Sequence, residues 1–184
     1  MSRLLILTLS VLYASFIWAK PAYQIDLIVF AHKNNISMSH EDITAPLLPV
    51  SKNAIPLLTN SGKSSKPYHL LPTSQSQLRD EYYQLSRKSG YQVLGHYSWL
   101  QNASSQSIVA LPTTSRNGWQ IQGTVQVRQS NYYLIDADLQ CTTPANNEFS
   151  INVKQKQRIK GNLVNYLDHP QIGILVKVHK IVTS

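Results

Sequence analysis

Apolar and polar residues alternate with a period of two along much of this chain, which is typical of β-strands. Residues 23–31, YQIDLIVFA, are apolar on both sides and predict a strand that is covered on both faces. The final run, 171–182, is also apolar on both sides, so we expect it to lie centrally, beside 23–31. A further strand is expected at 91–100, and the residues predicted to share one of its faces are Tyr91, Val93, Tyr97 and Trp99.

The clearest local prediction is a β-hairpin. Residues 119–128 and 132–140 both alternate with a period of two, and Ser130-Asn131 is suited to turn the chain between them. Another strand is expected at about 149–160. The inward-facing residues of the hairpin should be Trp119, Ile121, Val125 and Val127 in the first strand, and Tyr133, Ile135, Ala137 and Leu139 in the second.

One helix is predicted, at roughly 75–89. Ser74 and Gln77 have the spacing of a capping box, and Gly90 is placed to end the helix in a left-handed conformation. The apolar stripe of this helix, at positions i, i+4 and i+7, consists of Leu78, Tyr82 and Leu85.

These elements predict an α+β fold, with a mainly antiparallel sheet and one substantial helix packed on it. Residues 20–184 should form a single domain. Inside it, residues 33–72 contain five prolines among Ser, Asn and Lys clusters, and we expect a long irregular loop there.

The first 19 residues have the layout of a secretory signal peptide. Arg3 gives a positive start, residues 4–18 are apolar and uncharged, and Ala19 offers a small residue for cleavage. An uncleaved membrane anchor is the alternative, but an apolar run of about 15 residues is short of the ~20 needed to cross a bilayer. We therefore expect an exported chain, cleaved after Ala19, with no transmembrane segment afterwards.

The charge balance indicates an anionic partner. The chain carries 17 Lys and Arg against 9 Asp and Glu, a formal net charge of +8, so its field attracts polyanions. For an exported protein the candidates are anionic cell-envelope polymers, lipid head groups or an acidic protein, and not nucleic acid.

The most specific charge pattern is a basic stripe formed by Lys154, Lys156, Arg158 and Lys160. In an extended chain these alternate residues project from one face and form a ladder of about 20 Å. The stripe is predicted as the ligand-binding surface. The alternative is that it is a solvated face or edge strand whose lysines block unwanted strand pairing.

No catalytic, metal or cofactor site is predicted. The six histidines have no zinc-site spacing, and hydrolase motifs of the G-x-S-x-G, H-E-x-x-H and S-x-x-K types are lacking. Cys141, the only cysteine, should be a small buried or half-buried residue, and Asp136 and Asp138 should share an outward strand face. Most aromatic residues should lie in the core. The aromatic residues expected at the surface are Tyr68, Tyr132 and Tyr166.

Asp168 and His169 stand side by side before Pro170 and could be taken for an acid–base pair. Proline favours an extended residue before it, and aspartate is a good turn former. Since no nucleophile or metal ligand accompanies the pair, we predict a corner between two strands there.

Four blocks, in order, resemble the CsiV family of periplasmic peptidoglycan-binding proteins of Gram-negative bacteria: YQIDLIVFAH, GYQVLGHYSWLQ, WQIQGTVQVRQSNYYLIDADLQ and QRIKGNLVNYLDHPQIGILVKV. The chain departs from the family pattern in its lysines at KQKQRIK and throughout 33–72. The positions that carry the resemblance, and that mark the fold, are Trp99, Gly123, Arg158, Tyr166, Asp168, His169, Pro170 and Gly173.

The resemblance implies a non-enzymatic envelope protein that binds peptidoglycan. It also implies action through an outer-membrane lipoprotein activator in support of a class A penicillin-binding protein. The alternatives are a secreted or surface protein-interaction module on the same scaffold, and a hydrolase, which would have to release muropeptides.

Overall fold

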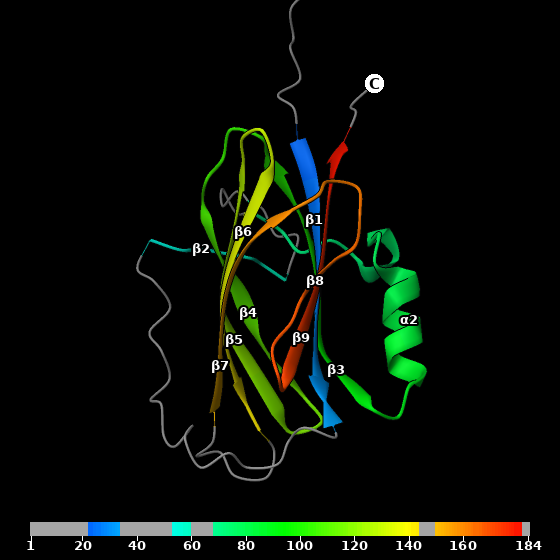
Figure 1. Cartoon of the computed structure of the whole chain (residues 1–184). Coiled ribbons are helices and arrows are strands. Elements are labelled where there is room, and N and C mark those ends of the chain that lie inside the picture. Colours follow the sequence, from blue (N-terminus) through cyan, green and yellow to red (C-terminus); the bar gives the residue numbers. More distant parts are fainter. Residues whose placement is uncertain (1–21, 34–52, 60–67, 144–149, 182–184) are drawn as a thin grey trace, which may run out of the picture.

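Two β-sheets pack face to face, and a helix covers the outer face of one of them (Figure 1). The computed structural model describes residues 22–33, 53–59, 68–143 and 150–181. The predicted α+β class, mainly antiparallel with one substantial helix in a single domain, is confirmed. The strands are divided between two layers, in place of the one sheet that the sequence predicted.

The four-stranded sheet has the order β3-β1-β9-β8, and all of its pairs are antiparallel. The prediction that the first and last long strands lie side by side at the centre is confirmed, since β1 pairs with β9 along its length. The bounds of these strands are β1 (Ala22–His32), β3 (Tyr91–Asn102), β8 (Asn165–Leu167) and β9 (Ile172–Ile181).

The five-stranded sheet has the order β2-β4-β5-β6-β7, antiparallel except for the short pair β2–β4. The predicted hairpin is β5–β6 and the strand expected at 149–160 is β7, so both predictions are confirmed. The bounds are β2 (Ile55–Pro56), β4 (Ile108–Arg116), β5 (Trp119–Gln129), β6 (Tyr133–Thr142) and β7 (Ser150–Ile159).

Strand β4 was not predicted. Pro112 interrupts its apolar run, and proline is usually excluded from strands because it lacks the N–H donor. The pairing with β5 shifts register between Leu111 and Thr114, which places the proline at the irregularity.

The main core lies between the sheets, where the inward residues of both meet. All eight inward positions predicted for the hairpin are buried, and Cys141 is buried among them, as predicted. Burial of each large apolar side chain contributes roughly 1.5–3 kcal/mol, so this layer dominates the stability of the fold.

One prediction about β3 is wrong. Val29 pairs with Gly95 but Phe30 pairs with Val93, so Leu94 is an extra residue in β3. An extra residue reverses the alternation of the strand. Tyr97 and Trp99 therefore face the main core, while Tyr91 and Val93 face the helix.

The helix, α2 (Arg79–Arg87), follows a 3-10 turn, η2 (Thr73–Gln75). Its predicted stripe is confirmed, and it packs on the outer face of the four-stranded sheet against Ile28, Phe30 and Val93. Figure 1 shows α2 on the side of this sheet away from β4–β7.

Both predicted helix ends are wrong. The residue before the first turn is Leu78, no side chain caps it, and the Ser76 hydroxyl accepts the Leu78 N–H at 3.1 Å. At the other end Lys88 is extended, and Gly90 is not among the glycines with positive φ. The chain therefore leaves the helix through an ordinary extended residue, two residues early.

The segment 33–72 is described only in part. Its described pieces contain β2 and a parallel bridge between Leu58 and His69. Tyr68 was expected to be exposed, but it is 4% exposed and packs in the main core with Leu57. The predicted signal peptide lies outside the described residues. Within those residues, no helix has the length and apolar character to span a membrane.

Candidate binding site

The basic stripe predicted from the sequence lies on β7, the edge strand of the five-stranded sheet. Lys154 Nζ lies 3.5 Å from Asp138 Oδ2, and Lys156 Nζ lies 4.0 Å from Asp136 Oδ2 on the neighbouring strand. Asp136 and Asp138 do share an outward face, as predicted, and there they offset the charge of the two lysines.

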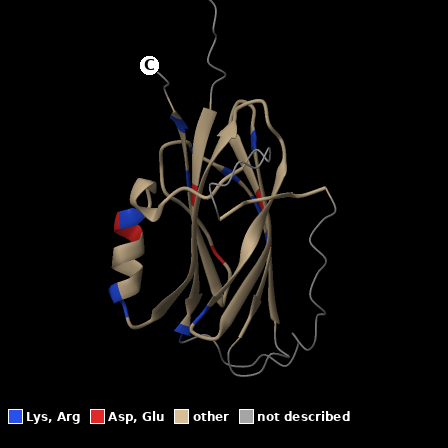
Figure 2. Ribbon diagram, turned by 180° about the vertical axis from the view of Figure 1, so that it is seen from behind, with Lys and Arg blue, Asp and Glu red and all other residues tan. Residues whose placement is uncertain are grey.

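The other end of the stripe is arranged differently. The Arg158 guanidinium lies over the ring of Tyr132, with 4.1 Å between its Cζ and the ring centroid. Lys160 follows the strand and is exposed. Figure 2 shows basic residues spread over several elements and not gathered in one dense patch. The stripe is thus one exposed edge of mixed charge.

Among the positions that carry the family resemblance, the tryptophan and the two glycines are closely packed by neighbouring strands and side chains. Trp99 is fully buried in the main core. Gly123 has φ +145, and a Cβ there would overlap the backbone of Asp138, while a Cβ at Gly173 would overlap the ring of Phe30. These positions determine the packing of strands and rings.

Asp168, His169 and Pro170 form the corner between β8 and β9, so that prediction is confirmed. The Tyr166 hydroxyl donates to Asp168 Oδ1 at 2.6 Å and lies 3.2 Å from His32 Nε2. Burial, together with Asp168, raises the pKa of Tyr166. His169 Nδ1 accepts the Gln171 N–H at 3.3 Å, which fixes the corner.

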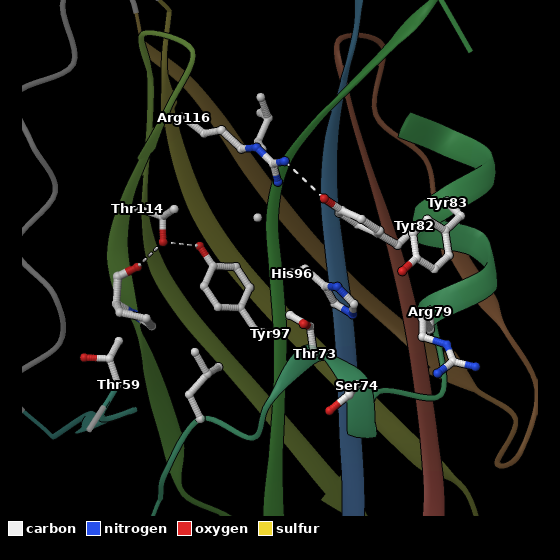
Figure 3. A pocket seen from close by; sticks show the side chains of 14 residues that line it. Thr59, Thr73, Ser74, Arg79, Tyr82, Tyr83, His96, Tyr97, Thr114 and Arg116 are labelled. Carbon is white, nitrogen blue, oxygen red and sulfur yellow. Dashed lines mark hydrogen bonds between the residues drawn. The ribbon is translucent and has the colours of Figure 1, made fainter. Parts of the chain in front are cut away.

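A pocket of about 450 Å³ lies where the edges of the two sheets separate (Figure 3). Its floor is the β3 segment from Leu94 to Tyr97, one wall is helix α2, and the other wall is the end of β4. Figure 3 shows the side chains of Tyr82, His96, Tyr97, Thr114 and Arg116 converging on it from these three elements.

The helix wall is aromatic. The Tyr82 ring stacks on the His96 ring, with 5.2 Å between centroids and 20° between planes. Tyr83 lies beside it and is 53% exposed. The stripe of α2 that packs on the sheet thus includes a tyrosine, Tyr82, whose hydroxyl reaches the pocket.

The β4 wall is polar. The Tyr97 hydroxyl donates to Thr114 Oγ1 at 3.0 Å, and Arg116 Nη2 donates to the Tyr82 hydroxyl at 3.1 Å. The Tyr97 ring folds back over Gly95, where a Cβ would lie 2.5 Å from ring atom Cε2. A residue without a side chain is therefore needed at 95 to admit the ring.

The pocket is electropositive. Arg79 and Arg116 line it, and no aspartate or glutamate of the described residues does. Asp80 and Glu81 stand in the first turn of α2 but are not part of the lining. The hydrogen bond from Arg116 lowers the pKa of Tyr82. A guanidinium group that keeps unused N–H donors beside aromatic rings is suited to bind a carboxylate ligand.

One contact at the pocket resembles a nucleophile with its base. His96 Nε2 lies 2.7 Å from Ser76 Oγ, but Ser76 is 6% exposed and its Oγ already accepts the Leu78 N–H. Burial lowers the pKa of His96, with Arg116 adding to the effect against the influence of Asp26. The pair therefore supports the start of α2.

Burial raises the pKa of Cys141 to about 12, so this thiol is unreactive. In the ranges that the structure describes, no group of three or more His, Cys, Asp and Glu side chains could hold a metal ion.

Sequence reasoning missed this pocket because its residues come from separate parts of the chain: α2, β3, β4, η2 and the segments that carry Thr59 and Leu70. Tyr82 was assigned to the packing stripe of the helix, and Tyr97 to a strand face. The usable signal was that Arg116 stands just before the Asn117-Gly118 turn, at the end of a strand that was not predicted.

A protein-family model described as "Peptidoglycan-binding protein, CsiV" matches residues 2–181 of the chain. Searches of curated proteins and of solved structures gave no match. The match covers nearly the whole chain, including both sheets, the helix and every wall of the pocket.

Proposed function

Because the chain belongs to the CsiV family of peptidoglycan-binding proteins, we propose that it binds peptidoglycan in the periplasm as a non-enzymatic adaptor. The observation that supports this best is the pocket lined by Arg79 and Arg116 with tyrosine rings and, among the described residues, no carboxylate. Peptidoglycan consists of glycan chains that carry short peptides with free carboxylates, and guanidinium groups pair with carboxylates in a bidentate manner.

The basic stripe has a secondary role in this proposal. Two of its charges are offset by Asp136 and Asp138, so its attraction for an anionic polymer is moderate. The net charge of +8, or +7 once Arg3 leaves with the signal peptide, draws the chain toward the anionic wall, and salt screens such attraction over about 10 Å. The basic stripe therefore contributes to the first electrostatic attraction to the polymer, and the pocket provides specific binding.

Export belongs to the proposal too. Residues 1–19 act as a signal peptide that is cleaved after Ala19 and releases the chain into the periplasm. Intact mass of the protein from a periplasmic extract tests this, because an uncleaved chain keeps the mass of those residues and stays with the membrane fraction.

A surface for the partner protein is available at residues 160–165. The Asn165 side chain fixes this turn: its Oδ1 accepts the Lys160 N–H at 3.1 Å, and its Nδ2 donates to Lys160 O at 2.9 Å and Leu163 O at 2.8 Å. The turn nevertheless exposes Leu163 by 55% and Val164 by 40%. Apolar side chains held in solvent by an ordered turn favour a protein contact, here with an outer-membrane lipoprotein activator of a class A penicillin-binding protein.

The same exposed pair also supports the alternative, a secreted or surface protein-interaction module. Cell fractionation separates the two: the proposed role requires the protein in the periplasm, whereas the alternative requires it in the culture supernatant or at the cell surface.

The central experiment is sedimentation with purified sacculi. The wild-type protein should sediment, and binding should persist in part at high salt, because pocket contacts are less screened than surface attraction. Sacculi incubated with the protein should release no muropeptides, as a binding protein leaves the polymer intact. The proposal fails if the protein stays in solution at both low and high salt.

A further inference from the structure

Strand β3 is an open edge of the four-stranded sheet. It pairs with β1 on one side, and no described strand pairs with it on the other. On that other side the Ser98 carbonyl accepts the Leu71 N–H at 2.7 Å, so the chain itself occupies the edge at Ser98 and leaves it open only at the pocket. Backbone groups of an antiparallel strand alternate between its two sides, so the N–H and C=O of His96 face the same open side as those of Ser98. His96 belongs to the β3 segment that forms the floor of the pocket.

The facing wall is open as well. Strand β4 pairs with β2 only at Val109 and Ala110, and beyond Pro112 it pairs with β5 alone among the described strands. The pocket thus runs between two strand edges. Its volume of about 450 Å³ lies within the range of small-ligand sites, about 300–1,000 Å³.

The charges select an anionic occupant. Figure 3 shows Arg116 and Arg79 toward opposite ends of the pocket, with Tyr82 and His96 between them. Arg116 gives one of its donors to the Tyr82 hydroxyl, and a guanidinium has further donors for a carboxylate. Tyr82 therefore holds Arg116 over the open edge of β3.

We infer that this pocket binds the peptide part of peptidoglycan as an extended strand beside β3, with a free carboxylate on Arg116. The inference rests on the proposed peptidoglycan binding and names the chemical class that the site takes. An open strand edge offers alternating N–H and C=O groups, which match another peptide backbone. Sugar rings have no such spacing, so the glycan chain stays outside the pocket.

Calorimetric titration of the full mature chain tests the inference with three probes: the free stem peptide, the same peptide with its carboxylates amidated, and glycan strands stripped of peptide. The free peptide should bind. Amidation, or the substitution Arg116→Gln, should each weaken binding roughly ten- to hundredfold, as for loss of a hydrogen-bonded charge. The glycan strands should neither bind at the pocket nor compete.

Arg87→Gln is the matched control, because Arg87 ends the same helix and does not line the pocket. It should leave peptide affinity unchanged, which separates local recognition from net charge. Thermal unfolding of both variants checks that the fold is intact, and Arg79→Gln gives a second variant at the other end of the pocket.

Two outcomes separate this inference from the proposed function. If sacculi bind the protein while the free peptide does not, and stripped glycan strands compete for sacculi, the inference is wrong and peptidoglycan binding stands. If the protein does not sediment with sacculi at all, the proposed function is wrong and the inference falls with it. Equal affinity for free and amidated peptide would also overturn the inference.

Discussion

Arg116 donates a hydrogen bond to the Tyr82 hydroxyl at 3.1 Å, and this contact joins β4 of one sheet to the helix that packs on the other. The guanidinium also lies near the face of the same ring, with 5.9 Å from its Cζ to the centroid. Each residue thereby fixes the other at the mouth of the pocket. Removing either side chain should loosen one wall without disturbing the core.

Substitution Arg116→Met should return the pKa of Tyr82 toward the ordinary tyrosine value of about 10, because the hydrogen bond from Arg116 is the main cause of its lowering. The contact is exposed, so the free energy of unfolding should change by less than about 1 kcal/mol. Absorbance titration of tyrosinate, with Tyr82→Phe subtracted, measures the shift. An unchanged titration curve would contradict the hydrogen bond between Arg116 and the Tyr82 hydroxyl.

Gly123→Ala should destabilise the protein strongly. The residue has φ +145, and a Cβ would overlap the backbone of Asp138 in the paired strand. The backbone conformation alone costs roughly 1–3 kcal/mol, and the overlap adds to it. Gly90→Ala is the control, because nothing lies within 4 Å of a Cβ there and its φ is not positive. Denaturant unfolding should show a large loss for the first variant and little change for the second.

The parts of the fold that the sequence predicted are those in which one physical pattern dominates. Strands β5 and β6 bury one face each, so their period of two gives both the hairpin and its inward residues. Strand β1 is covered on one side by the other sheet and on the other side by the helix, and β9 buries its inward side against the other sheet and adds Leu175 to the helix face, which explains their central position.

The parts that were not predicted depend on single residues in three-dimensional context. Leu94 inserts into β3 and reverses its faces, although nothing in the local pattern distinguishes it from its neighbours. Strand β4 was not predicted because, in the sequence, a proline at a register shift such as Pro112 cannot be told from a proline in a loop. The pocket was not predicted, since Tyr82, His96 and Arg116 meet only when a helix and two sheet edges are assembled.

The unfolding free energy should fall as the pH drops below about 6.5, the ordinary pKa of histidine. Burial lowers the pKa of His96 and His179, and for His179 this outweighs the attraction of Asp26, whose Oδ2 lies 3.7 Å from Nδ1. The folded histidines stay neutral where the unfolded chain takes up protons, so stability is present above that pH and lost below it. The slope is at most about 1.4 kcal/mol per pH unit for each histidine.

His96→Gln tests the sign, because glutamine can keep a hydrogen bond to Ser76 without titrating. Denaturant unfolding between about pH 7.5 and pH 5.5 should give a shallower pH dependence for the variant than for the wild type. Parallel profiles would mean that His96 takes up protons equally in the folded and unfolded chain.

The two halves of the basic stripe should differ in their effect on sacculus binding. Lys154 and Lys156 are offset by carboxylates on β6, whereas Arg158 and Lys160 form no ion pair with any acidic residue in the described part of the chain. The double variant Arg158→Gln with Lys160→Gln should therefore reduce low-salt sedimentation more than Lys154→Gln with Lys156→Gln. Each pair removes two positive charges, so an equal loss would indicate that only net charge matters.

Leu163→Ser with Val164→Ser should abolish capture of the proposed lipoprotein partner while leaving the fold and sacculus binding intact. The two side chains are 55% and 40% exposed, so they contribute little to folding, but removal of a central apolar contact weakens protein association by at least about tenfold. Asn165→Ala is the companion variant: it keeps both apolar side chains and removes the three side-chain hydrogen bonds that hold the turn, at a cost of about 1–3 kcal/mol. If an ordered turn is what presents the pair, both variants should lose the partner in a pull-down from detergent-solubilised envelopes, and both should still sediment with sacculi. Retention of the partner by the double serine variant would remove this turn from the proposed interface.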